Sequence, residues 1–220
     1  MKRGNMAFKL LTLLGLAGCN QTVKNQADVL AFSDKEVFTL YSKPDSSVRV
    51  ARVLTTDNKT FNLLLYELII STPEGAKQKF ISSEQLTQQQ LDTKKTELQS
   101  NYNWSPFRGN DVLFVQIQPT SFKNEMELLD KRQEIETKLS DALEKKNLGE
   151  WFAGDVGPGG GNMLYTINNI EQALQTTLVL LQQNRLDKNV LIGRRVKVNN
   201  DDWFYEVIYP PKYSGNFNTM

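Results

Sequence analysis

Residues 111–117 read DVLFVQI, an almost wholly apolar run that is typical of a buried strand. The pattern predicts a helix next, from about Asn124 to Asn147, because apolar residues recur on one helical face and Gly149 follows as a stop. The residues of that face are Leu128, Ile135, Leu139, Ala142 and Leu143. The second half of the chain therefore opens with a strand and a long helix.

The rest of this half continues to alternate between predicted strands and helices. Residues 151–153 and 163–167 are predicted to be short strands, and Asn168 with Glu171 three positions later has the pattern of a helix N-cap. The helix that follows has one apolar face, formed by Ile170, Ala173, Leu174, Thr177, Leu178 and Leu181. Another strand opens at residues 190–192.

The resulting order, β-α-β-β-α-β, is that of the ferredoxin-like arrangement, in which two helices cover one face of a four-stranded antiparallel sheet. Residues 202–209 alternate well enough to add a C-terminal strand. We therefore expect a ferredoxin-like module with one added strand over residues 108–212.

The first half is expected to form a β-meander plus one helix over residues 36–103, so the fold class is α+β. The predicted strands are residues 37–41, 48–53 and 61–70. The segment from Ser82 to Gln85 has a capping-box pattern before a polar helix that runs to about Ser100. Residues 102–110 contain Pro106 and Gly109, interrupt both patterns and mark the boundary between the two regions.

The first eighteen residues have the parts of a secretory signal. Residues 1–9 contain three basic residues and no acidic one, and a short apolar run follows at residues 10–16. This run is far shorter than the roughly 20 residues that a membrane-spanning helix needs.

Residues 16–19, with the sequence LAGC, resemble the lipobox of bacterial lipoproteins, and Cys19 is the only Cys in the chain. The resemblance implies that the signal peptide, residues 1–18, is removed and that Cys19 carries a diacylglyceryl group and an amino-terminal fatty acyl chain such as palmitate. An ordinary signal peptide with a chance Cys is the alternative.

The resemblance also implies an address in the bacterial envelope, with the membrane as a partner through the lipid anchor. Asn20, rather than Asp, follows the Cys, which by resemblance to enterobacterial sorting favours the outer membrane and a folded part in the periplasm. Residues 19–35 are polar and are interpreted as a lipidated tether. The alternative is a strand at residues 29–32 that docks on the folded part.

Composition excludes several function classes. The chain has no His and one Cys, which removes His-dependent nucleophiles, His-ligated zinc and intramolecular disulfides. Loss of residues 1–18 removes Lys2, Arg3 and Lys9 and no acid, so 26 Lys+Arg become 23 against 25 Asp+Glu. A nucleic-acid partner needs a basic surplus that this balance lacks. No metal site and no cofactor are predicted.

Residues 154–162 are unusually rich in Gly and Pro. Such a segment can present backbone N–H groups to an anion, but phosphate-binding glycines lead from a strand into a helix, and here they lead from strand to strand. A β-hairpin connection is the main interpretation. The flanking Trp151, Asp155, Asn162 and Tyr165 nevertheless make this segment the predicted partner-binding surface.

No catalytic residue is predicted. The acidic residues that could serve a hydrolase have no diagnostic spacing, and they are Glu150, Asp155, Asp201, Asp202 and Glu206. The predicted function is that of a lipid-anchored periplasmic protein that binds another protein. One version is an immunity-type inhibitor of an antibacterial effector. Residues 111–211 loosely resemble small ferredoxin-like bacterial proteins of that kind and of uncharacterised kinds. The alternatives are an envelope assembly or maintenance lipoprotein and a carboxylate-dependent envelope hydrolase.

Overall fold

The structure is a computed structural model, and it describes residues 34–71, 75–107, 109 and 111–217. The predicted signal peptide, Cys19, and the predicted tether up to residue 33 lie outside the described residues. All described residues belong to one compact unit. Independent folding of the two predicted regions therefore stays a prediction.

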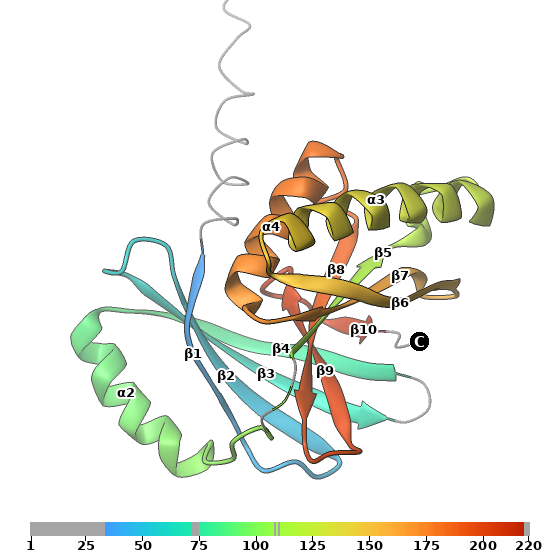
Figure 1. The fold of residues 1–220 in the computed structure, drawn as a ribbon. Helices are drawn as coiled ribbons and strands as arrows, with labels where there is room; N and C mark the ends of the chain where they lie inside the picture. The colour runs from blue at the N-terminus through green and yellow to red at the C-terminus, as the bar shows by residue number, and fades with distance from the viewer. Residues whose placement is uncertain (1–33, 72–74, 108, 110, 218–220) are drawn as a thin grey trace, which may run out of the picture. The chain divides into compact units, whose positions relative to one another are not determined.

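The fold is α+β, with two five-stranded antiparallel sheets and three α-helices among the described residues (Figure 1). Sheet 1 has the order β1-β2-β3-β4-β10, and its strands are β1 Lys35–Tyr41, β2 Ser47–Thr55, β3 Phe61–Ser71, β4 Gly75–Leu86 and β10 Gly215–Phe217. Sheet 2 has the order β6-β7-β5-β8-β9, and its strands are β5 Asp111–Ile117, β6 Gly149–Gly157, β7 Gly160–Ile167, β8 Val190–Lys197 and β9 Trp203–Tyr209. The helices are α2 Gln88–Asn101, α3 Glu125–Lys145 and α4 Ile170–Gln183, with a short 3₁₀ turn, η1, at Pro119–Ser121.

Helices α3 and α4 lie side by side on one face of sheet 2, α3 against β6 and β7 and α4 against β5 (Figure 1). The apolar face predicted for α3 is the buried one, with Leu128, Ile135, Leu139 and Leu143 inside. Its N-cap is Asn124, whose side chain accepts a hydrogen bond from the Glu127 N–H. Periodicity and capping together thus fix this helix.

Two boundaries differ from the sequence-based expectation. The segment from Ser82 to Gln85 is not a helix start but the end of β4, paired with β3 along its length. The capping box is instead formed by Thr87 and Gln90, so α2 begins at Gln88. For α4, the cap is Asn169 rather than Asn168, because the Asn169 side chain accepts from the Gln172 N–H.

Strand β2 of sheet 1 is buried on both faces along most of its length. Along β2, Val48, Val50 and Leu54 face a core that also contains Val196 and Phe204 of sheet 2. Ala51 and Val53 face the opposite side, where Leu91 and Leu98 of α2 pack against the sheet. The predicted strand at residues 48–53 therefore lies between two cores, with Arg49 as its one exposed residue.

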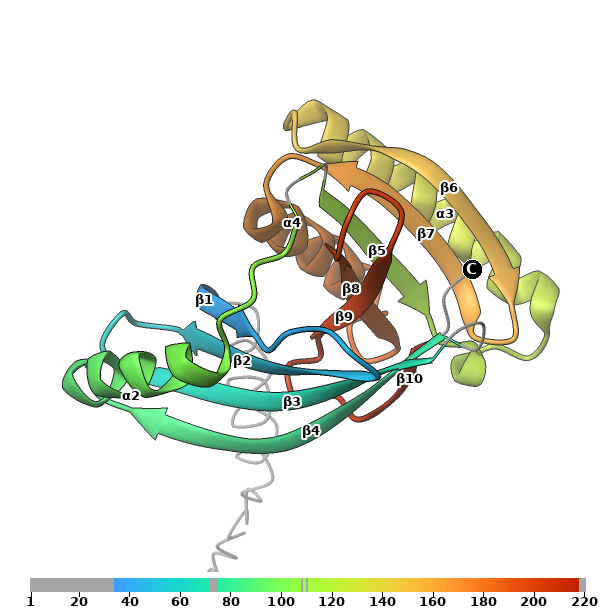
Figure 2. The same cartoon turned by 90° about the horizontal axis from the view of Figure 1, so that it is seen from below.

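The two sheets meet at β9, the outermost strand of sheet 2 on the side nearest sheet 1 (Figure 2). Side chains of sheet 1 bond the backbone of this edge strand. Gln78 donates from Nε2 to the Val207 carbonyl at 3.1 Å and accepts from the Val207 N–H at 3.0 Å. Arg52 donates from Nη1 to the Ile208 carbonyl at 3.0 Å. The N–H and carbonyl of Val207 and the carbonyl of Ile208 are thereby hydrogen-bonded at the sheet edge without another strand.

The C-terminal strand β10 completes the junction. It pairs with β4 of sheet 1, while Phe217 is fully buried against Phe114 and Tyr205 of sheet 2. A Cβ at Gly193 would lie 3.0 Å from the Phe217 ring, so the absence of a side chain there makes room for it. The sequence analysis predicted neither β4 nor β10.

Candidate functional site

Four charged side chains from four strands form a buried cluster between the sheets. They are Glu36 on β1, Arg52 on β2, Arg194 on β8 and Glu206 on β9. Arg194 donates from Nη1 to Oε1 of Glu36 at 2.8 Å and from Nε to Oε2 of Glu206 at 2.9 Å. Arg52 donates from Nε to Oε2 of Glu36 at 2.7 Å. Cations and anions alternate, so the cluster is neutral in sum.

Burial makes this pairing obligatory. Arg52 is 4% exposed and Glu206 is 1% exposed, and an ionised group at that depth is unfavourable unless it is paired and hydrogen-bonded. Glu206 is the only charged residue of β9, and Arg52 lies between the buried Ala51 and Val53 of β2. The cluster thus ties β1 and β2 of the first half to β8 and β9 of the second.

Two neighbouring hydroxyl groups complete the cluster. The Tyr41 hydroxyl donates to Oε2 of Glu206 at 2.8 Å, and Thr39 Oγ1 accepts from Nη2 of Arg194 at 2.9 Å. Burial, reinforced by the carboxylates of Glu206 and Glu36, raises the pKa of Tyr41 well above its usual range. Tyr41 therefore stays protonated and acts as a donor.

The electrostatics of Glu36 follow from its two arginines. Burial alone would raise the pKa of this carboxyl group, but attraction by Arg194 and Arg52 outweighs it and lowers the pKa to about 2. Glu36 is therefore a permanent anion near neutral pH. It cannot act there as a proton donor.

A hollow of about 260 Å³ opens beside this cluster. The buried Tyr41, with Glu36 and Arg194, lines one part of it, and Phe107 and Lys197 line another. Ligand pockets for drug-sized molecules are typically about 300–1,000 Å³. The hollow therefore has room for one or two side chains of another molecule rather than for a large cofactor.

Two exposed aromatic rings and two cations lie next to the hollow. Phe107 is 47% exposed and Trp203 is 49% exposed. The Lys197 Nζ lies 5.9 Å from the centre of the Phe107 ring, and the Arg195 guanidinium lies 5.7 Å from that of Trp203. Lys197 is also the cross-strand neighbour of Trp203, and its carbonyl accepts the Phe107 N–H at 2.9 Å. We call these four residues the aromatic–cation surface.

A second pair of exposed aromatic residues lies on β6, the outer strand at the other side of sheet 2. Trp151 is 41% exposed and Phe152 is 44% exposed. The pairing of β6 with β7 shifts between Trp151 and Ala153, so Phe152 sits in a bulge. Neither residue contributes to a core cluster described for these sheets.

The four residues predicted to bind a partner do not share one surface. Trp151 and Asp155 are exposed, whereas Tyr165 is fully buried and Asn162 is 3% exposed. They form two cross-strand pairs, Trp151 with Tyr165 and Asp155 with Asn162. The Asn162 amide donates to Asp155 at 2.7 Å and accepts from Gln116 at 2.9 Å. Only Trp151 and Asp155 are available to a partner at this surface.

The glycine-rich segment is a hairpin whose strands β6 and β7 run up to Gly157 and Gly160. The positive φ lies at Gly160, at 128°, where a Cβ would also collide with the Ile117 carbonyl. Gly154 and Gly161 instead provide space for the side chain of Arg132 from α3, which donates to the Asn162 carbonyl at 3.1 Å and pairs with Glu136. These glycines therefore serve close packing inside the fold.

The acidic residues considered for hydrolysis are dispersed. Glu150, Asp155, Asp201 and Asp202 are exposed, and Glu206 belongs to the buried cluster. Sequence reasoning missed Glu36, Arg52 and Arg194. The available signal was the position of Glu206 within the otherwise uncharged strand WFYEVIY, where an isolated buried charge needs a partner.

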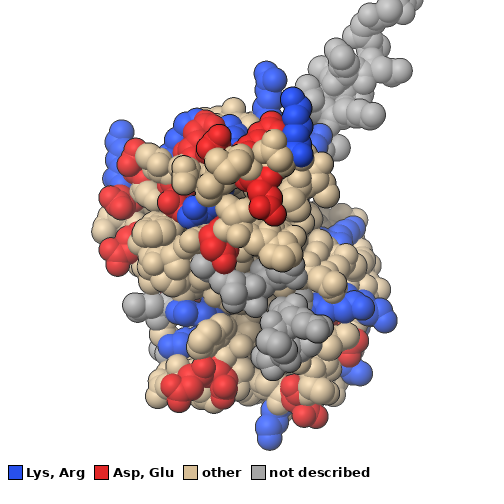
Figure 3. Space-filling view, turned by 90° about the vertical axis from the view of Figure 1, so that its right-hand side faces the viewer, with Lys and Arg blue, Asp and Glu red and all other residues tan. Residues whose placement is uncertain are grey.

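The described residues contain no group of three or more His, Cys, Asp or Glu residues that could hold a metal ion. None of the helices in this part of the chain is both long and apolar enough to cross a membrane. Acidic and basic side chains alternate over the face in Figure 3, without a large area of one sign.

Comparisons with known proteins do not assign the chain to a family: no family model matches it, and neither the curated proteins nor the solved structures include a match.

Proposed function

We propose that this chain is a lipid-anchored protein of the bacterial envelope that binds another protein and does not act as an enzyme. The anchor rests on the lipobox resemblance of residues 16–19, with Cys19 as the acylated residue and the outer membrane as the address. Two or more acyl chains make such anchoring stable.

One observation carries the binding role: large aromatic side chains are exposed at two places on sheet 2 or in the connection that leads into it. They are Phe107 and Trp203 beside the hollow and Trp151 and Phe152 on β6. Trp and Tyr are enriched among residues that dominate protein–protein binding energy, and exposed aromatic groups of this kind are typical of contact surfaces. We propose these four residues as partner-binding residues in place of those predicted from the sequence. Trp151 is the one residue that the two groups share.

The proposal that the chain is not an enzyme is supported by the state of Glu36, a carboxylate that lines the hollow, and of its neighbour Glu206. Glu36 and Glu206 are both held by Arg194, and the pKa of Glu36 is about 2. A general acid works best with a pKa near the operating pH. A carboxylate-dependent hydrolase would need a different environment around these groups.

At the finer level of fold, we propose that sheet 2 with α3 and α4 is a ferredoxin-like module to which β9 is added. The order β6-β7-β5-β8 with both helices on one face supports this assignment, since it corresponds to chain order 2-3-1-4 within an antiparallel sheet.

An immunity-type inhibitor is the version of the function that we propose, with a toxic effector as partner. A toxin gene beside this gene, whose product this protein neutralises, is the expected genetic context.

Capture from envelope extract by the full chain tests the binding role. The quadruple variant Phe107→Ser, Trp203→Ser, Trp151→Ser and Phe152→Ser should lose a discrete captured protein that the unmodified chain retains. The control carries Ile81→Ser and Val179→Ser, which are equally exposed apolar positions at 51% and 48%. Equal capture by all three chains, or no discrete partner, contradicts the proposal.

A further inference from the structure

We infer that the aromatic–cation surface is the docking site for the partner, and that it takes an acidic peptide segment in which apolar side chains flank carboxylates. This inference rests on the proposed protein-binding function and names the surface and the chemistry of the partner. Nothing in the predicted set of Trp151, Asp155, Asn162 and Tyr165 lies on it.

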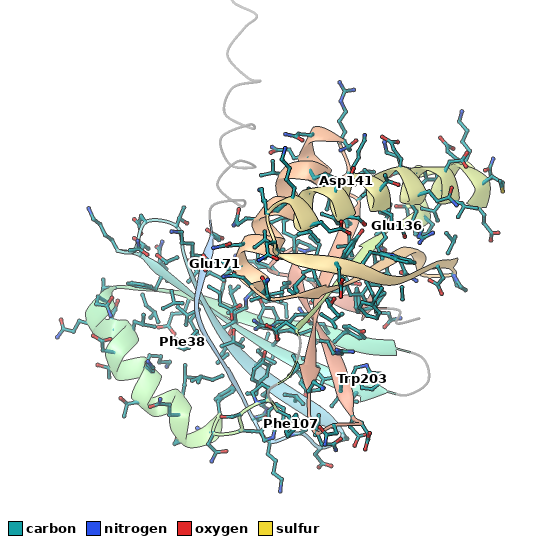
Figure 4. The ribbon with its side chains drawn as sticks, in the orientation of Figure 1. Phe38, Phe107, Glu136, Asp141, Glu171 and Trp203 are labelled. Carbon is teal, nitrogen blue, oxygen red and sulfur yellow. The ribbon has the colours of Figure 1, made fainter. Side chains whose placement is uncertain are left out.

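Geometry provides the first argument. In Figure 4, Phe107 and Trp203 lie toward the same end of the β8–β9 hairpin. Lys197 connects them, because it is the cross-strand neighbour of Trp203 and lies over the Phe107 ring. A Cβ at Gly109 would lie 2.9 Å from the Lys197 Nζ, so a glycine there leaves space for the lysine side chain. The surface is thus built around Lys197.

Charge provides the second argument. The cluster of Glu36, Arg52, Arg194 and Glu206 is neutral in sum, so it adds no net charge to the hollow. The lining contributes two further cations, Arg195 and Lys197, and one further acid, Asp111. Among the described residues Lys197 forms no ion pair.

Asp111 is the one further acid of the described lining. Desolvation by the surrounding protein raises its pKa, and the attraction of Arg194 and Arg195 opposes the shift. Asp201 and Asp202, in the turn before Trp203, are exposed and lie outside the lining. The described part of the lining therefore has three cations, Arg194, Arg195 and Lys197, against two acids, Glu36 and Asp111, and complements a carboxylate.

Size provides the third argument. About 260 Å³ accommodates an acidic side chain with its neighbour, and the exposed rings of Phe107 and Trp203 offer apolar area beside it. A cation next to an aromatic ring contributes both attraction for a carboxylate and packing area. An acidic segment with interspersed apolar residues satisfies both demands at once.

Fluorine NMR of the full chain in detergent micelles tests this inference. The chain has three tryptophans, so fluorotryptophan labelling gives three signals, which single Trp→Phe variants assign. The probes are acetyl-Glu-Leu-Glu-Phe-Glu-amide and the matched basic peptide acetyl-Lys-Leu-Lys-Phe-Lys-amide. We expect the acidic peptide to shift the Trp203 signal and to leave the Trp151 and Trp104 signals in place.

Two variants locate the charge requirement without removing a ring. Lys197→Met and Arg195→Gln should each weaken binding of the acidic peptide by roughly tenfold, as loss of a central interface residue does. Asp201→Asn should strengthen it slightly. Trp151→Phe is the matched control and should leave the Trp203 shift unchanged.

Equal shifts with both peptides, no shift at Trp203, or full binding by Lys197→Met and Arg195→Gln each overturn the docking site. Failure of the site is distinguishable from failure of the proposed function. If envelope extract yields a partner whose capture depends on Trp151 and Phe152 and not on Lys197, the protein binds its partner elsewhere.

Discussion

The Tyr41 hydroxyl donates a 2.8 Å hydrogen bond to Glu206, a residue 165 positions later in the chain. Tyr41 ends β1 of sheet 1 and Glu206 lies in the middle of β9 of sheet 2. Arg194 also donates to the same oxygen of Glu206, and its guanidinium reaches back to Glu36 on β1. The two halves of the folded part are thus joined by hydrogen bonds between largely buried polar groups.

This cluster should respond strongly to loss of one charge. Arg194→Met leaves the carboxylate of Glu206 buried with only the Tyr41 hydroxyl, so we expect a loss of about 3–5 kcal/mol in the free energy of unfolding. The double variant Arg194→Met, Glu206→Gln should recover part of that loss, because no buried charge remains in β9. Urea unfolding measures both values.

The control for this pair is Lys138→Met, which removes an exposed helix-surface pair with Glu134 and should change stability by less than about 1 kcal/mol. A loss as small for Arg194→Met as for Lys138→Met contradicts the importance of the cluster.

Acid should weaken the same cluster through Glu36. Its folded-state pKa of about 2 is below the ordinary value of 4.5, so the stabilisation is present above pH 4.5 and is lost as the pH falls toward 2. The full linkage corresponds to roughly 3 kcal/mol. The difference in stability between the unmodified chain and Glu36→Gln should therefore shrink steadily from pH 5 down to pH 2. A difference between them that stays constant over this range shows that Glu36 is not stabilised by Arg194 and Arg52.

The hairpin glycines should separate into two classes. Gly160→Ala places a side chain at a φ of 128° and against the Ile117 carbonyl, so we expect destabilisation of more than about 1 kcal/mol. Gly157→Ala meets nothing within 4 Å and should change the melting temperature little. Thermal melting of the two variants side by side is sufficient. Equal melting temperatures would mean that the turn has another conformation.

Lipidation is tested by Cys19→Ser. If Cys19 receives the lipid, the variant should incorporate no labelled palmitate and should accumulate as uncleaved precursor. The matched control, Ser33→Ala, leaves the lipobox intact and should be labelled and processed normally. Labelling of the Cys19→Ser variant at the level of the control would eliminate the lipoprotein proposal.

The sequence predicted the second half of the chain better than the first. Strand β5 and helix α3 carry strong local patterns, an apolar run and a long amphipathic repeat, which do not depend on distant residues. Strand β4 has a polar sequence, GAKQKFISSEQL, and is fixed by its pairing with β3, so no local pattern indicates it. Strand β10 has three residues and is fixed by pairing with β4 and by burial of Phe217.

The candidate site was less predictable for the same reason. Glu36 and Arg194 are 158 positions apart, and only the packing of two sheets brings them together. Tyr165 was expected at a surface because it flanks the glycine-rich segment. It is buried because β7 is an inner strand between β6 and β5, and the Tyr165 hydroxyl points toward the backbone of α3 at Glu136.

The most direct test of the central claim, binding of another envelope protein through exposed aromatic positions, is site-specific photo-crosslinking in the cells that produce the protein. A photoreactive residue replaces Trp203, Trp151 or the control position Ile81, one at a time. We predict one discrete crosslinked protein from Trp203 that is absent from Ile81, and loss of that product when Lys197→Met is added. The same products from Trp203 and Ile81, or none from either aromatic position, would contradict the claim.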